Sequence, residues 1–110
     1  MDNETALKAM KQNFSECQSL LIALGDENRQ NILLALADKS CKEGLRVGEI
    51  KEKVNLSRPA VSHHLKILRE AKLVKVRQEG TMNFYSADLI TDFDKLNNLV
   101  QTIKLIGENE

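Results

Sequence analysis

The spacing of hydrophobic residues changes from a helical period to a period of two near residue 73, and this change constrains the fold most strongly. Apolar residues lie three or four apart between Val61 and Ala71, as on one face of a helix. Apolar and polar residues then alternate at 74–77 and again at 82–85, as in two strands. Because Glu79-Gly80 separates these runs, a helix followed directly by a two-stranded hairpin is expected.

A short turn separates that helix from an earlier one. Residues 47–54 carry apolar side chains at helical spacing, and Asn55-Leu56-Ser57 forms the turn. Ser57 is a favourable N-cap, and Pro59 falls in the first turn, where its missing N–H costs nothing. Two short helices joined by a tight turn and followed by a hairpin predict a winged helix-turn-helix.

Two apolar stripes with alternating three- and four-residue intervals lie outside this motif, near the two ends of the chain. The first predicts one continuous helix that Gly25 ends, after which Asp26 caps a further helix. Both stripes carry more apolar surface than so small a domain needs, which predicts a homodimer through the first and last helices. The predicted interface residues are Leu7, Met10, Phe14, Cys17, Leu21, Phe93, Leu96, Val100 and Ile103.

The expected fold class is therefore mainly α with a two-stranded β-hairpin wing, in the order α-α-α-α-β-β-α. Residues 1–110 are expected to form a single winged helix-turn-helix domain. Within it, 1–24 and 88–107 are the dimerisation helices, 46–72 the helix-turn-helix and 73–86 the wing.

Charge is distributed unevenly although the net charge is zero. Residues 45–86 carry nine Lys and Arg against four Asp and Glu, whereas both flanking segments are net acidic. A basic middle indicates a polyanionic partner for that segment alone.

Membrane and export segments are not expected, because the longest apolar run is the six residues 32–37. The sequence thus predicts a cytoplasmic protein with no membrane partner. In that compartment a disulfide between Cys17 and Cys41 is not expected.

The candidate functional residues lie on the predicted second helix of the motif and on the wing. An α-helix fits the major groove of double-stranded DNA, where polar side chains hydrogen-bond to base edges and phosphates. His64 leans towards the apolar face of its helix more than its neighbour His63 does. The predicted DNA-binding residues are Ser57, Arg58, Ser62, His63, His64, Lys66, Arg77, Thr81 and Asn83.

The stretch V-S-H-H-L-K-I-L-R-E-A, followed by L-V-K-V-R-Q-E-G and F-Y-S, closely resembles the ArsR/SmtB family of bacterial winged-helix repressors. The segment L-G-D-E-N-R-Q-N-I-L is similar to the family's sequence ahead of that unit, so the resemblance covers about residues 18–90. It implies a homodimer that binds an inverted-repeat, palindromic operator as a repressor and releases it when an inducer binds. It also implies that Ser62 and His63 face the groove, with Ser57 and Arg58 at the helix start.

The chain departs from the family pattern at three places. Lys72 stands where the family has a helix-ending glycine, so the helix is expected to end differently. Arg46-Val47-Gly48 stands where the family has a C-x-C thiolate motif. The last helix offers no histidine beside its acidic residues Asp92, Asp94 and Glu108, so neither a metal site nor any other cofactor is expected.

Two alternatives to a simple DNA-binding repressor remain open. Cys41 lies between lysines, and paired first helices could approach each other at Cys17, so a thiol-, redox- or arsenite-responsive repressor is one alternative. A winged-helix protein-interaction module is another. An enzyme is not expected, because the chain lacks a glycine-rich phosphate loop and a nucleophile beside a positioned base.

Overall fold

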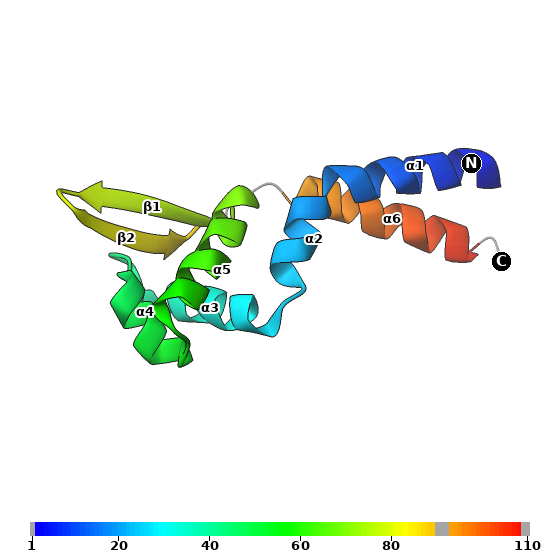
Figure 1. The fold of residues 1–110 in the computed structure, drawn as a ribbon. Coiled ribbons are helices and arrows are strands. Elements are labelled where there is room, and N and C mark those ends of the chain that lie inside the picture. Colours follow the sequence, from blue (N-terminus) through cyan, green and yellow to red (C-terminus); the bar gives the residue numbers. More distant parts are fainter. Residues whose placement is uncertain (1, 90–92, 109–110) are drawn as a thin grey trace. The chain divides into compact units, whose positions relative to one another are not determined.

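The computed structural model describes residues 2–89 and 93–108. Figure 1 shows the elements, which in chain order are α1 (Asn3–Glu16), α2 (Gln18–Leu24), α3 (Glu27–Ala37), the 3₁₀ turn η1 (Lys39–Cys41), α4 (Val47–Val54), α5 (Arg58–Glu70), β1 (Val74–Glu79), β2 (Met82–Ala87) and α6 (Asp94–Glu108). They form two compact units. The terminal unit comprises described residues 2–21 and 93–108, and the central unit comprises residues 22–89.

The terminal unit is built on α1 and α6, which lie side by side (Figure 1). Ala6 and Leu99 are buried. The Asn13 side chain donates to the hydroxyl of Thr102 at 2.6 Å and to the carbonyl of Asn98 at 3.1 Å. The hydrogen bonds of Asn13 therefore join α1 to α6, and Thr102, one of their acceptors, is itself buried.

The first helical stripe is divided between two helices, where one continuous helix was predicted. Cys17 ends α1 with φ −111° and ψ 17°, and α2 begins at the next residue. The carbonyl of Asn13 accepts hydrogen bonds from both the backbone N–H of Cys17, at 3.2 Å, and its thiol, at 3.0 Å. Ser15, Cys17 and Ser19 are all weak helix formers, so a local break costs little at this point.

The central unit packs α3, α4 and α5 against the hairpin. Its fully buried side chains include Ile32, Ile50, Leu65 and Leu73, one from each of the elements or turns that surround the core. Asp26 caps α3 as predicted, because its carboxylate accepts the N–H of Arg29 at 3.1 Å. The short turn η1 follows α3, and the carboxylate of Asp38 caps it by accepting the N–H of Ser40 at 3.0 Å.

The hairpin is confirmed, with β1 and β2 antiparallel and Val74 paired with Ala87 at its base. Glu79 pairs with Met82, so the turn residues are Gly80-Thr81, one position later than predicted. Gly80 has φ 59°, the left-handed conformation that two-residue hairpin turns require. Reciprocal backbone hydrogen bonds of 2.8 Å between Leu45 and Tyr85 attach the wing to the segment before α4.

The end of α5 corrects the expectation for Lys72, which adopts the left-handed conformation itself, with φ 61°. The N–H of Leu73 donates to the carbonyl of Leu68 at 3.0 Å, and that of Lys72 to Arg69 at 2.9 Å. These two bonds form a Schellman motif, and its two apolar residues Leu68 and Leu73 are both buried. The helix therefore ends as a glycine-terminated helix would, because burial of Leu73 offsets the strain at Lys72.

The last helix begins at Asp94, so Leu89 lies outside it, exposed to solvent. Within α6 the buried residues are Leu99 and Thr102, whereas Val100 and Ile103 are exposed. No helix in the described part of the chain is long and apolar enough to cross a membrane.

Candidate nucleic-acid interface

Helix α5 presents one apolar face to the core and one polar face to solvent. The hydroxyl of Ser57 accepts the N–H of Ala60 at 3.3 Å, and Pro59 lies in the first turn, so the helix starts where the sequence predicted. Val61 and Leu65 are buried with Leu68 on the inner face. The exposed polar residues of the helix and its N-cap are Ser57, Arg58, Ser62, His63, Lys66, Arg69 and Glu70.

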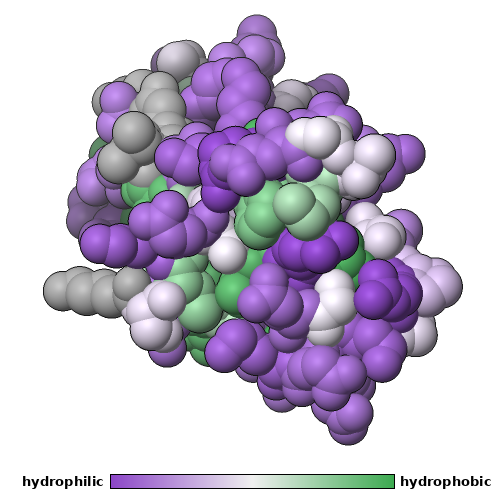
Figure 2. Space-filling view, turned by 90° about the vertical axis from the view of Figure 1, so that its left-hand side faces the viewer, coloured by the Kyte–Doolittle hydropathy of each residue, from purple (hydrophilic) through white to green (hydrophobic). Residues whose placement is uncertain are grey.

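Figure 2 shows the molecule from the side of the hairpin and α4, and hydrophilic residues cover most of that face. A groove lies beside α5, and its charged lining residues are Lys66, Arg69 and Glu70 of the helix and Lys75 of β1. Lys75 was not among the predicted site residues. Successive side chains of a strand point to opposite faces, so the position of Lys75 next to the buried Val74 could have predicted that Lys75 faces solvent.

His64 occupies a different environment from its neighbour, because it is half-buried and contacts Arg29 of α3. The guanidinium of Arg29 donates to Nδ1 of His64 at 3.1 Å. The same guanidinium donates to the carbonyls of Ile22 at 2.7 Å and Ala23 at 3.0 Å, at the end of α2. A guanidinium can only donate, so Nδ1 carries the lone pair and Nε2 carries the proton.

The same contacts act on the charge of the imidazole. Burial lowers the pKa of His64 below its usual value of 6.5, although the carboxylate of Asp26 acts in the opposite direction. The positive charges of Arg29 and His63 lower the pKa further. His64 is thus held as a neutral ring that offers one N–H donor.

Arg77 of the wing is engaged within the central unit. Its guanidinium forms an ion pair with Glu79 and donates to the carbonyl of Glu43 at 3.0 Å. It also lies over the ring of Phe84, 4.7 Å from the centroid. These contacts fasten β1 to the loop before α4, so Arg77 fixes the position of the wing whose exposed residues include Thr81 and Asn83.

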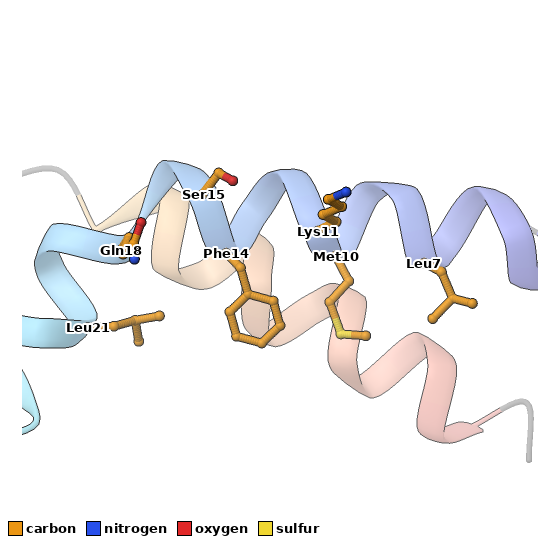
Figure 3. Close-up of a pocket in the computed structure, with 7 residues that line it drawn as sticks. All are labelled: Leu7, Met10, Lys11, Phe14, Ser15, Gln18 and Leu21. Atoms are coloured by element: carbon orange, nitrogen blue, oxygen red, sulfur yellow. The ribbon is translucent and has the colours of Figure 1, made fainter.

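The residues predicted to form the dimer interface divide into two groups. Leu7 and Phe14 of α1 are each 47% exposed, and Ile103 of α6 is 46% exposed. Figure 3 shows Leu7, Met10 and Phe14 projecting from one side of α1, where they line a groove of about 590 Å³ together with Leu21. The remaining exposed or half-buried members of the predicted set are Phe93, Leu96 and Val100.

Cys17 differs from this set because it is buried within the terminal unit. Cys41 is buried as well, in the central unit, and both thiols are free. Buried thiols react slowly with oxidants and metals, which disfavours the thiol-responsive alternative. Within residues 2–89 and 93–108, no three His, Cys, Asp or Glu side chains are grouped as metal ligands, and Asp92 lies outside the described residues.

Comparison with known proteins places this arrangement in a family. Residues 26–76 match the family described as bacterial regulatory protein, arsR family. An HTH-type transcriptional regulator of Methanocaldococcus jannaschii is 34% identical over 97 residues, which cover 88% of this chain and 98% of the relative. The transcriptional repressor SdpR of Bacillus subtilis is 31% identical over 88 residues, covering 80% of this chain and 92% of SdpR.

A solved structure agrees with the sequence relatives. An ArsR-like transcriptional regulator from Rhodococcus superposes with a TM-score of 0.64 at 27% identity, covering 87% of this chain and 81% of the other. The matched residues contain the helix-turn-helix and the start of the first strand of the wing. The chain therefore belongs to the arsR family of bacterial regulatory proteins and is a DNA-binding transcriptional regulator, not an enzyme.

Proposed function

We propose that this protein is a cytoplasmic repressor that binds an inverted-repeat operator in double-stranded DNA as a homodimer. The observation that carries the proposal is the exposed polar face of α5, opposite a face that is buried along its length. Ser62 and His63 offer donors and acceptors to base edges, and Arg58 and Lys66 offer charges to phosphates.

His64, Thr81 and Asn83 complete the proposed contact surface. His64 presents its single Nε2–H donor, because Nδ1 accepts from Arg29. Thr81 and Asn83 lie at and beside the hairpin turn, where a wing follows the DNA backbone or enters a minor groove. Arg77 contributes by holding the wing in place.

The homodimer is supported by the apolar groove on α1 and by the exposed residues of α6. Two copies that cover these surfaces would present two α5 helices to half-sites about 34 Å apart, one turn of the duplex. Such a repressor releases its operator when an inducer favours a dimer geometry that misaligns the two helices.

The test is a fluorescence-anisotropy titration of a duplex from upstream of the protein's own gene against a scrambled duplex of equal length. We expect Ser62→Ala and His63→Ala to weaken operator binding by about fivefold to a hundredfold, with little change on the scrambled duplex. Lys66→Gln should weaken both and reduce the slope of log affinity against log salt by about 1.

Lys104→Gln, an exposed lysine of α6, is the matched charge control and should leave affinity unchanged. Equal affinity of all variants for both duplexes would contradict the proposal. DNA affinity that does not change with salt concentration, together with binding of an acidic protein to the same surface, would favour the interaction-module alternative.

A further inference from the structure

A polar groove lies between the start of α4, the start of α5 and the wing, and the predicted interface does not include most of its lining. Its volume is about 450 Å³, and all the residues around it belong to the central unit. The lining residues are Arg46, Val47, Gly48, Glu49, Arg58 and Asn83.

Gly48 keeps this groove open to the Arg58 guanidinium. A Cβ placed on Gly48 would lie 2.9 Å from Nη2 of Arg58, closer than real Cβ contacts allow. A side chain at residue 48 would therefore have to displace the end of the flexible Arg58 side chain from the first turn of α4. This close approach brings the guanidinium to the same groove as Arg46 and Asn83.

The groove holds two guanidinium groups and one carboxylate. In the part of the chain that the structure describes, no hydrogen bond or ion pair engages the guanidinium of Arg46 or Arg58. The carboxylate of Glu49 accepts the backbone N–H of Arg46 at 3.0 Å, so this acidic group is directed to the helix start. The net charge of the groove is therefore positive. Its cations are planar guanidinium groups, whose N–H donors suit a tetrahedral oxyanion.

We propose that this groove binds a phosphate group, supplied by the DNA backbone between the recognition helix and the wing. The inference rests on the proposed function and extends it to Arg46 and Gly48, which the sequence did not single out as DNA-binding residues. Arg46 and Arg58 take the phosphate oxygens, and the amide of Asn83 adds a donor from the wing. Because a phosphate carries no sequence information, the site strengthens binding to every duplex equally.

The test compares four variants on operator and scrambled duplexes at several salt concentrations. We expect Arg46→Gln to weaken both complexes about tenfold and to lower the salt slope by about 1 for each site lost. Gly48→Ala should act in the same direction, because it displaces Arg58 without removing a charge. Glu49→Gln should strengthen both complexes, whereas Lys53→Gln, an exposed lysine on the same helix, should match the wild type.

Two further measurements identify the source of the phosphate. On a duplex with a neutral methylphosphonate at the contacted position, Arg46→Gln should cause no further loss, which assigns the DNA backbone. An NMR titration of the DNA-free protein with inorganic phosphate follows the guanidinium signals of Arg46 and Arg58. If inorganic phosphate shifts these signals while Arg46→Gln binds DNA as tightly as the wild type, the groove is a phosphate site that takes a free anion.

Wild-type affinity in both Arg46→Gln and Gly48→Ala, with no response to inorganic phosphate, would overturn the proposal. If the wild-type protein preferred no duplex, the proposed function would fail, and the phosphate titration would still decide whether the groove binds the anion.

Discussion

At the scale of single residues, Arg29 and His64 connect three helices through one buried guanidinium. Arg29 is 9% exposed, and it is the partner of two backbone carbonyls of α2 as well as of His64 on α5. A buried charge is tolerated only when its donors are satisfied, and this one has three acceptors. The recognition helix is therefore held to the core by a bond that requires a neutral imidazole.

This bond predicts how stability depends on pH. Because the pKa of His64 is lowered in the folded protein, the unfolded chain binds more protons as the pH falls from 7 through 6.5 towards the folded pKa. The free energy of unfolding should therefore decrease over this range. The lowered pKa values of Asp2, Asp26 and Asp38 reduce stability at more acidic pH, from about pH 5 downward, where the unfolded carboxyls begin to bind protons.

His64→Asn is the matched variant, because its carbonyl can accept from Arg29 but cannot be protonated. We expect the variant to lose stability less steeply than the wild type between pH 7 and 5, measured by urea unfolding. Parallel curves for the two proteins would show that His64 does not carry the effect.

At the scale of the secondary-structure elements, the end of α5 determines where the wing begins. The Schellman motif places Leu73 in the core and directs the chain into β1, whose first residue Val74 is also buried. This geometry requires a left-handed backbone at Lys72, which is strained for a lysine. Asn55 at the end of α4 adopts the same conformation with φ 55°, but asparagine tolerates it.

Lys72→Gly should therefore stabilise the protein by about 1 kcal/mol, because glycine adopts positive φ without steric strain. Lys72→Ala removes the same side chain but keeps a Cβ, so it should be less stable than Lys72→Gly by about 1 kcal/mol. Thermal and urea unfolding of the three proteins provide the measurement. An equal gain from both substitutions would attribute the effect to the lysine side chain instead of the backbone.

At the scale of the whole molecule, the exposed apolar residues of the terminal unit favour a second copy of the chain. Leu7, Phe14 and Ile103 remain accessible, while α1 and α6 contact each other through smaller and more polar residues. An apolar surface of this kind is costly to leave in water.

Leu7→Glu combined with Ile103→Glu should give a folded monomer by analytical ultracentrifugation. Its operator affinity should fall about a hundredfold or more, because the second half-site is no longer bound intramolecularly. Leu34→Glu is the control, since Leu34 of α3 is 70% exposed in the central unit and should leave the dimer intact. A double variant that stays dimeric would place the interface elsewhere.

Local features of the sequence determined most of the architecture. Ser57, Pro59 and the apolar spacing that follows predicted the start and both faces of α5, because capping and periodicity depend on neighbours within a few residues. The alternation at 74–77 and 82–85 predicted the hairpin for the same reason, and the basic segment 45–86 predicted its polyanionic partner.

Only the tertiary structure decided which polar groups meet. Nothing near Arg29 in the sequence indicates that it reaches His64, 35 positions later, or that Gly48 lies under Arg58. The division of the first stripe at Cys17 and the engagement of Arg77 with Glu43 likewise depend on the packed chain. The spacing of residues records which face is apolar, whereas hydrogen-bond partners are chosen when distant segments pack and each buried donor must find an acceptor.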